Sequence, residues 1–287
     1  MAIDTQGRTG CLLAGFVLLA CATAASAAPL MYEPFGYVGP SLDGQGAAEL
    51  GLAGTWQTGV GLAADALNHV GDVGLSDDAA SLEHPSLPAS LGARVLDDGA
   101  DAGTAKRSLD GFTLSWNTND VWFISALIQG KGLIQFQSDA HSRISFGIND
   151  AGEFQVGFKA TDQRQMSATY AGGAGSYDPD TTYLLVVQGA PSTTGGQDRI
   201  AMNVYDAAMA PPAAMASPAV EPGAWDLVAG PHNSGVVMNT ISLAFYDAPG
   251  QIDEIRIGTE WADVVPEPAS LLLFAAAGLG LLRRRAA

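Results

Sequence analysis

Short apolar or alternating segments recur through the middle of the chain and predict β-strands. Residues 121–128 form a run that is apolar except for Ser125, which is typical of a central strand buried on both faces. Residues 133–137 alternate in part. Residues 143–148 alternate cleanly, residues 154–158 follow after a turn at Asn-Asp-Ala-Gly, and this pair predicts a β-hairpin.

Further strand patterns lie on both sides of this central part. Residues 182–187 and 199–205 predict a second pair of strands, and residues 241–245 and 251–257 predict strands near the end of the chain. Residues 31–38 predict a first strand at a sheet margin, because Pro34 lacks the amide that an inner strand needs. Short strands at a spacing of roughly ten residues predict an all-β, antiparallel, two-sheet sandwich.

Other segments lack a strand pattern. Residues 44–61 are rich in glycine and predict a loop around Trp56, and residues 71–103 predict mostly loop because Pro85, Pro88 and Asp/Gly pairs interrupt them. Residues 62–69 predict at most a turn or two of helix. Residues 207–222, rich in alanine and proline, predict a long surface connection.

The N-terminus carries the pattern of a signal peptide. Arg8 precedes an apolar run at residues 12–25, and Ala25 and Ala27 form an A-x-A pattern that predicts a signal helix in residues 1–27 and cleavage before Ala28. An alternative is a lipoprotein box at residues 18–21, with Cys21 acylated. Cys11 and Cys21 are the only cysteines, so the mature chain has no disulfide.

The C-terminus combines three features in order. Pro266, Glu267 and Pro268 are followed by an apolar run at residues 269–282 and then by Arg283, Arg284 and Arg285. About 14 apolar residues make a helix of about 21 Å, which is shorter than the hydrocarbon core of roughly 30 Å. The arginines extend the span by reaching the headgroups, act as a membrane stop and place the preceding domain outside the cytoplasm.

This tail resembles the PEP-CTERM sorting signal of Gram-negative bacteria. The resemblance implies that an exosortase recognises the tail in the membrane and removes it near Pro266, Glu267 and Pro268. An ordinary single-pass tail anchor stays open as the alternative. The predicted organisation is a signal peptide at residues 1–27, a β-sandwich at residues 28–264 and a sorting signal at residues 265–287.

The charge of the chain restricts its partners. The formal net charge is −17 and the pI is about 4.3. Such a negative charge argues against binding to nucleic acid or to anionic membrane surfaces, because these are also negatively charged. It is compatible with solubility outside the cell and with binding of divalent cations.

A second resemblance concerns the domain itself. Residues 250–264, and shorter stretches at 32–35, 41–45 and 121–125, resemble laminin-G-like, concanavalin-type jelly rolls found in PEP-CTERM proteins. The resemblance implies that the first and last strands lie side by side. It also implies a structural calcium, with Asp253 as a ligand and Glu33 completing an oxygen cage. Residues 59–111 match this group poorly.

The sequence offers little for catalysis. Laminarinase-type enzymes on this scaffold place two glutamates and an aspartate on one face of a strand, whereas Asp253 and Glu254 are adjacent and point to opposite faces. The histidines at 69, 84, 141 and 232 lack metal-ligand spacing and predict solvated loop residues. A Ser/His/Asp triad stays open, because its members come from distant positions. We therefore expect a protein that is not an enzyme.

Two functions remain, with a third as an outsider. The first is an exported surface or matrix protein that binds glycan or mediates adhesion, with Trp56, Trp116 and Trp225 as candidates for stacking on sugar rings. The second is a purely structural envelope or matrix component. The outsider is a glycan hydrolase or lyase. The expected partners are the Sec machinery, signal peptidase, an exosortase and exopolysaccharide.

Overall fold

The computed structural model describes most of the region between the two predicted processing signals. The described residues are 29–37, 41–46, 50–58, 74–75, 81–87, 94–97, 103–116, 120–138, 143–159, 165–169, 177–192, 197–209, 211, 225–232 and 237–265. The predicted signal helix, the predicted turn of helix at residues 62–69 and the predicted C-terminal hydrophobic helix lie outside them. Among the described residues, no helix combines the length and apolarity needed to cross a membrane.

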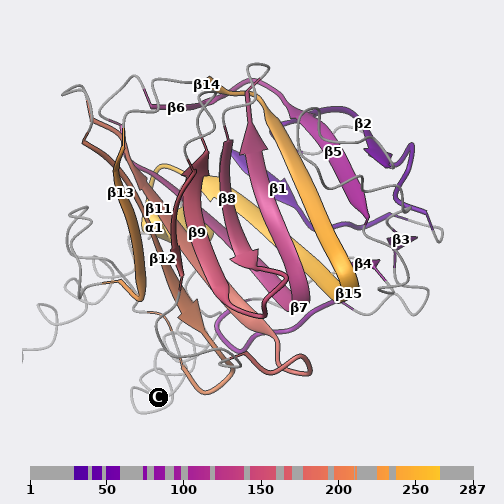
Figure 1. Ribbon diagram of the computed structural model, residues 1–287. Coiled ribbons are helices and arrows are strands. Elements are labelled where there is room, and N and C mark those ends of the chain that lie inside the picture. Colours follow the sequence, from indigo (N-terminus) through magenta and orange to yellow (C-terminus); the bar gives the residue numbers. More distant parts are fainter. Residues whose placement is uncertain are drawn as a thin grey trace, which may run out of the picture.

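Two long strands organise the fold. β7 (Trp122–Gln137) and β15 (Thr240–Gly258) pair antiparallel along almost their whole length, with Ile241 opposite Phe136 and Ile257 opposite Ile124. The pairing is interrupted between Phe245 and Gly250, and Gly130 opposite this point has a positive φ of 71°. Each long strand thereby contributes one half to each of two layers (Figure 1).

The first layer is built around the second half of β7 and the first half of β15. Its other described strands are β2 (Leu52–Thr58), β5 (Thr104–Leu109), β8 (Arg143–Ile148), β9 (Phe154–Lys159) and β10 (Gln165–Thr169). The order is β10-β9-β8-β7 on one side, and β15, β5 and β2 continue it on the other.

The second layer is built around the first half of β7 and the second half of β15. Its other described strands are β1 (Met31–Glu33), β3 (Gly74–Leu75), β4 (Val95–Asp97), β11 (Tyr183–Ala190), β12 (Asp198–Tyr205) and β13 (Leu227–His232). β13 contacts β9 and β10, so the two layers face each other. A separate two-stranded sheet joins β6 (Leu114–Ser115) to β14 (Val237–Met238).

The all-β, antiparallel sandwich predicted from the sequence is confirmed. The predicted hairpin is the β8–β9 pair, and the second predicted pair is β11 and β12. β1 lies beside the end of β15, with Met31 opposite Ile257, as the second resemblance implies. Three predictions are wrong in detail: the glycine-rich residues 44–61 contain β2, residues 71–103 contain β3 and β4, and each long strand was expected as two.

A main core and a second core explain the mostly apolar first half of β7. Trp122, Ile124, Ala126 and Ile128 belong to the main core between the layers. The alternate residues Phe123 and Leu127 belong to a second core on the outer face of the second layer. Because side chains of a strand alternate between faces, a strand buried on both faces is apolar over most of its length.

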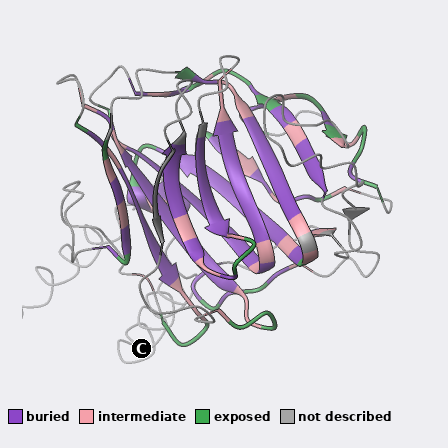
Figure 2. Cartoon of the chain, in the orientation of Figure 1, coloured by how far each residue is buried: buried purple, intermediate pink, exposed green. Residues whose placement is uncertain are grey.

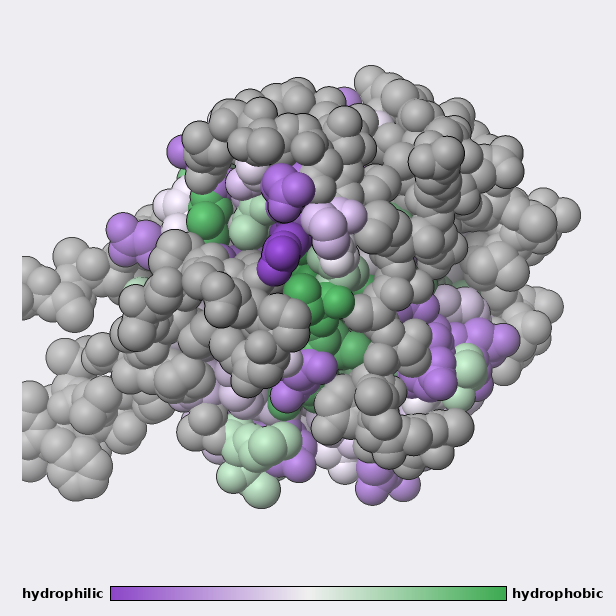
Figure 3. Space-filling model, turned by 60° about the vertical axis from the view of Figure 1, so that its left-hand side comes forward, coloured by the Kyte–Doolittle hydropathy of each residue, from purple (hydrophilic) through white to green (hydrophobic). Residues whose placement is uncertain are grey.

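The second core is covered by segments that are not part of the sheet. Leu82 and Leu87 come from the connection at residues 81–87, and Trp261, Val264 and Val265 come from the end of the domain around α1 (Trp261–Val264). Figure 2 shows buried residues along the strands of both layers and exposed ones mainly in turns. Figure 3 brings forward the side that carries β12 and β13, where hydrophobic surface lies among hydrophilic side chains.

Candidate functional site

The segment after β15 packs back onto the second core. We call residues 259–265 the C-terminal clasp. Val264 is fully buried, Trp261 and Val265 are each 5% exposed, and the Trp261 ring meets Phe123 edge to face at 6.0 Å. The Ser125 hydroxyl of β7 donates a hydrogen bond of 2.7 Å to the Val264 carbonyl. Burial of each such apolar side chain contributes roughly 1.5–3 kcal/mol, so the clasp is part of the folded domain.

The Asp263 side chain binds backbone groups at the start of the clasp. Its Oδ2 atom accepts hydrogen bonds from the amides of Thr259 (3.0 Å) and Glu260 (2.9 Å) at the start of α1 and so caps the helix. The amide of Val265 donates to the Trp261 carbonyl at 2.9 Å. A Cβ at Gly258 would overlap with Asp263, so glycine is required where β15 meets the clasp.

The predicted Pro266, Glu267 and Pro268 follow the last clasp residue directly. They lie outside the described residues, as do Arg283, Arg284 and Arg285, and as do Ala25, Ala27 and Ala28 at the predicted signal cleavage point. Val265, which precedes Pro266, is buried among the residues of the second core.

A polar cluster on the same face of the sheet links β1 to β15. The Tyr32 hydroxyl donates to Glu254 at 2.8 Å, Arg256 donates to the other oxygen of Glu254 at 2.6 Å, and the Arg256 guanidinium lies 4.9 Å from the centre of the Tyr32 ring. Burial, together with the Glu254 charge, raises the pKa of Tyr32 to about 12. Glu254 has a φ of 52° at an irregularity in the β15–β7 pairing.

Asp253 connects the sheet to the segment at residues 81–87. Its carboxylate oxygens accept hydrogen bonds from the amides of Leu82 (2.9 Å) and Glu254 (2.8 Å). Burial raises the pKa of Asp253 to about 8, and the neighbouring Glu254 charge adds to this rise. The group therefore fastens the covering segment over the second core.

His84 is a structural residue of that covering segment. It is 4% exposed, its Nδ1 accepts the Ser86 amide at 3.2 Å, and its Nε2 lies 2.9 Å from the Asp206 carbonyl, to which the Nε2–H tautomer donates. Burial lowers the pKa of His84. The prediction that this histidine is solvated is wrong, because the segment packs on the second core.

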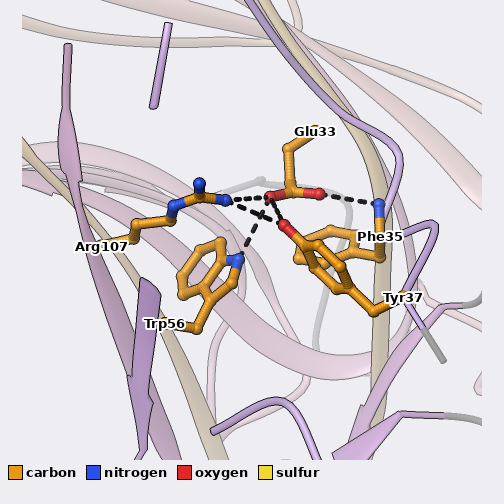
Figure 4. A network of polar contacts seen from close by, with 5 residues as sticks. All are labelled: Glu33, Phe35, Tyr37, Trp56 and Arg107. Atoms are coloured by element: carbon orange, nitrogen blue, oxygen red, sulfur yellow. Dashed lines mark hydrogen bonds and ion pairs between the residues drawn. The ribbon is translucent and has the colours of Figure 1, made fainter. Parts of the chain in front are cut away.

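Glu33 lies in a buried network on the opposite face of the sheet (Figure 4). One carboxylate oxygen accepts from the Phe35 amide at 2.8 Å. The other accepts from Tyr37 at 2.6 Å, from the Trp56 indole at 3.1 Å and from Arg107 at 3.2 Å. Burial raises the pKa of Glu33 against the opposing effect of these partners.

The residues predicted to share a calcium ion do not lie together. Glu33 is opposite Ile255, a main-core residue, whereas Asp253 is opposite Leu127, a second-core residue. Residues opposite each other in a sheet share a face, so the two carboxylates point to opposite faces. Their oxygens are also occupied by protein donors. The pair does not fit a single calcium ion, and the described residues hold no group of three or more His, Cys, Asp or Glu suited to a metal.

The tryptophans predicted to stack on sugar rings are core residues. Trp56 is fully buried, Trp116 is 1% exposed and Trp225 is 5% exposed. Trp116 packs edge to face against Trp122 and Phe158, at 5.1 and 4.8 Å. The assignment to glycan binding is therefore wrong for these side chains, because none presents a ring face to solvent.

Several residues of these polar networks were not predicted from the sequence. Arg107 and Tyr37 complete the Glu33 network, and Ser125 and Asp263 secure the clasp. Ser125 offered a signal, since it is the one hydroxyl in an otherwise apolar run. The other three carried none, because their partners are fixed by pairing of strands or by the close approach at Gly258.

Comparison with known structures gives remote likenesses. The T. cruzi calreticulin globular domain is 11% identical over 71% of this chain and 87% of its own, with a TM-score of 0.40. The botulinum neurotoxin serotype D binding domain is 7% identical over 88% of this chain and 51% of its own (TM-score 0.38). Apo Crh5 transglycosylase is 13% identical over 81% of this chain and 90% of its own, with a TM-score of 0.31. Such TM-scores carry no weight for function.

The comparison with family models bears on the end of the chain. No curated protein matches the sequence. Residues 264–286, however, match the family model of the PEP-CTERM protein-sorting motif, and this match begins within the clasp at Val264. The chain thus carries a PEP-CTERM protein-sorting motif at its C-terminus, which implies an exported protein that is processed by an exosortase.

Proposed function

We propose that this protein is an exported cell-surface or extracellular-matrix component of a Gram-negative bacterium, with a non-catalytic, structural β-sandwich. Sec and signal peptidase export it, and an exosortase removes the tail. The observation that supports this proposal best is the match of residues 264–286 to the sorting motif, which begins at the buried Val264.

The buried acidic side chains support a structural role. Within the described residues they are Glu33, Asp198, Asp253, Glu254 and Asp263. Each accepts hydrogen bonds from the chain itself, as Asp198 does from the Ser192 amide at 2.9 Å. Carboxylates that complete the fold in this way are not arranged for acid and nucleophile work.

Glycan binding or adhesion is the second role expected from the sequence. The three tryptophans that carried that expectation are in the core, so we favour the structural role. An exopolysaccharide partner and a structural calcium outside the Glu33–Asp253 pair stay predictions.

Fractionation of the native host tests the sorting step. The protein should leave the inner membrane in the wild-type host and accumulate there uncleaved in a host that lacks its exosortase. Replacing Pro266, Glu267 and Pro268 together by alanine should cause the same retention. Replacing Leu50, an exposed residue remote from the motif in sequence, by alanine serves as a control that should be sorted normally. Normal release of the triple variant would contradict the proposal.

A glycan array on the purified domain separates the structural role from glycan binding. The structural role predicts no specific binding, whereas saturable binding to one class of glycan would replace it with the adhesive role. Release of reducing ends from β-glucans would instead indicate the hydrolase.

A further inference from the structure

Two exposed leucines lie on adjoining backbone segments at the outer edge of β1. Leu30 is 39% exposed and Leu50 is 51% exposed, and they are two of the four large hydrophobic side chains that are exposed among the described residues. The Tyr32 amide donates a hydrogen bond of 3.2 Å to the Leu50 carbonyl, and a Cβ at Gly51 would overlap with the Leu30 carbonyl. We call Leu30, Tyr32 and Leu50 the β1 patch.

Tyr32 belongs to this patch because of the alternation along β1. Met31 is fully buried in the main core, so its neighbours Leu30 and Tyr32 point to the other side of the strand. Tyr32 is half-buried, and the hydrogen bond from its hydroxyl to Glu254 holds its ring in place. Apolar side chains beside a tyrosine are typical of surfaces that meet the headgroup region of a membrane.

The clasp approaches the same face of the sheet close to the β1 patch. The Val264 carbonyl is bonded to Ser125, which lies opposite Arg256, and Arg256 in turn lies opposite Tyr32. Residues opposite each other in a sheet share a face. Two strand spacings of about 4.8 Å separate Ser125 from Tyr32, so the clasp is seated about 10 Å from the patch.

Both segments that the sequence assigns to the membrane are connected to this place by short lengths of chain. The apolar run at residues 269–282 follows the clasp after three residues, so residue 269 lies at most about 14 Å from residue 265. Leu30 follows the predicted signal helix of residues 1–27 after two residues. The tether is therefore too short to hold this face far from the bilayer.

We propose that the β1 patch rests on the bilayer surface in the membrane-tethered precursor and fixes the orientation of the domain there. This inference rests on the proposed export and on insertion of the tail. The net charge of −17 disfavours anionic lipids, so the expected surface is one of zwitterionic headgroups. The tail supplies the anchoring, because so small a patch does not hold a domain on a membrane by itself.

Tryptophan quenching by brominated lipid tests the orientation in the full-length chain. The chain is inserted into vesicles of phosphatidylcholine brominated in its acyl chains or of ordinary phosphatidylcholine. The native tryptophans are at most 5% exposed, so the emission of an added tryptophan is measured by difference from the wild type. In Leu50→Trp the added emission should be mostly lost in the brominated vesicles, and Leu30→Trp gives an independent second position.

The matched control is Met209→Trp, because Met209 is 49% exposed but follows β12, and β15, β7 and β11 lie between β12 and β1. Its added emission should be the same in both kinds of vesicle. Melting temperatures equal to that of the wild type show that the variants are folded.

The outcomes separate the membrane from other occupants and this inference from the proposed function. Absence of quenching at both Leu30→Trp and Leu50→Trp would overturn the proposal and leave the patch to a protein such as the exosortase. Equal quenching at Met209→Trp would contradict a fixed orientation. If the patch positions are quenched while the protein from its host ends at Ala287, the patch faces the membrane and only the proposed processing fails.

Discussion

Glu33 shows how a single buried charge is matched by donors from distant parts of the chain. Its partners come from the residues that follow β1, from Trp56 on β2 and from Arg107 on β5. A buried ion pair is costly to break, because one charge is left without compensation. The sequence shows these residue types but not their meeting, since Arg107 lies 74 positions from Glu33.

The variant Glu33→Gln should therefore destabilise the domain strongly. The amide cannot accept on its nitrogen, and Arg107 loses its buried ion pair with Glu33, so we expect a loss of about 3 kcal/mol in the free energy of unfolding. Urea denaturation measures this loss. The exposed Glu83→Gln is the control, which should change stability by less than about 0.5 kcal/mol. Equal urea midpoints for the two variants would show that the network contributes nothing.

Asp253 should give the domain a specific pH dependence. Its pKa is raised to about 8 in the folded chain, against about 3.9 when unfolded, so between these values only the folded chain retains the proton. Its stabilising contribution is complete below about pH 4 and is lost as the pH rises to about 8, by at most about 1.4 kcal/mol per pH unit.

The comparison of the wild-type chain with Asp253→Asn isolates this contribution, because the asparagine does not titrate. The difference in free energy of unfolding, wild type minus variant, should fall from pH 4 to pH 8 in urea titrations. Two pH profiles that run parallel over this window would contradict the burial of Asp253.

The tryptophans offer a direct optical test. All five tryptophans of the chain are at most 5% exposed, so the emission should be blue-shifted relative to the unfolded chain and iodide should quench it only weakly. Soluble glycans should leave the spectrum unchanged. Strong quenching by iodide would show that the tryptophans are exposed. A shift in emission on adding a glycan would indicate that they bind sugar.

At the scale of elements, the long strands mark the limit of what the apolar pattern predicts. The strand at residues 121–128 and the β8–β9 hairpin were predicted because both carry a clear pattern over their length. Gly130 and residues 246–249 interrupt the pattern without ending β7 and β15, since the two strands pair with each other on both sides of the interruption. β2 was missed because Gly54 and its polar residues resemble a loop, and only pairing with β5 makes it a strand.

The bend in β7 should tolerate no side chain at Gly130. An alanine there would combine a positive φ of 71° with overlap of the Pro249 carbonyl. Gly54 on β2 has a similar φ of 66° but nothing within 4 Å, so Gly54→Ala is a matched control for the backbone strain alone. Such strain costs about 1–2 kcal/mol. Thermal unfolding should show Gly130→Ala to be less stable than Gly54→Ala by at least about 1 kcal/mol, and equal melting temperatures would contradict this view of the bend.

At the scale of the whole molecule, the domain and its sorting motif adjoin without a spacer. The sequence predicted the motif because its three features are local and in order, and the family comparison confirms it at residues 264–286. The sequence did not predict how the domain ends, because the clasp depends on Phe123 and Ser125, far away in β7. The predicted domain limits of 28 and 264 stay predictions.

Mass spectrometry of the mature protein from its native host tests the sorting function most directly. We predict a C-terminal peptide that includes Val265 and ends near Pro268. An intact peptide that ends at Ala287 would show that the tail is kept and that the protein is not processed by an exosortase.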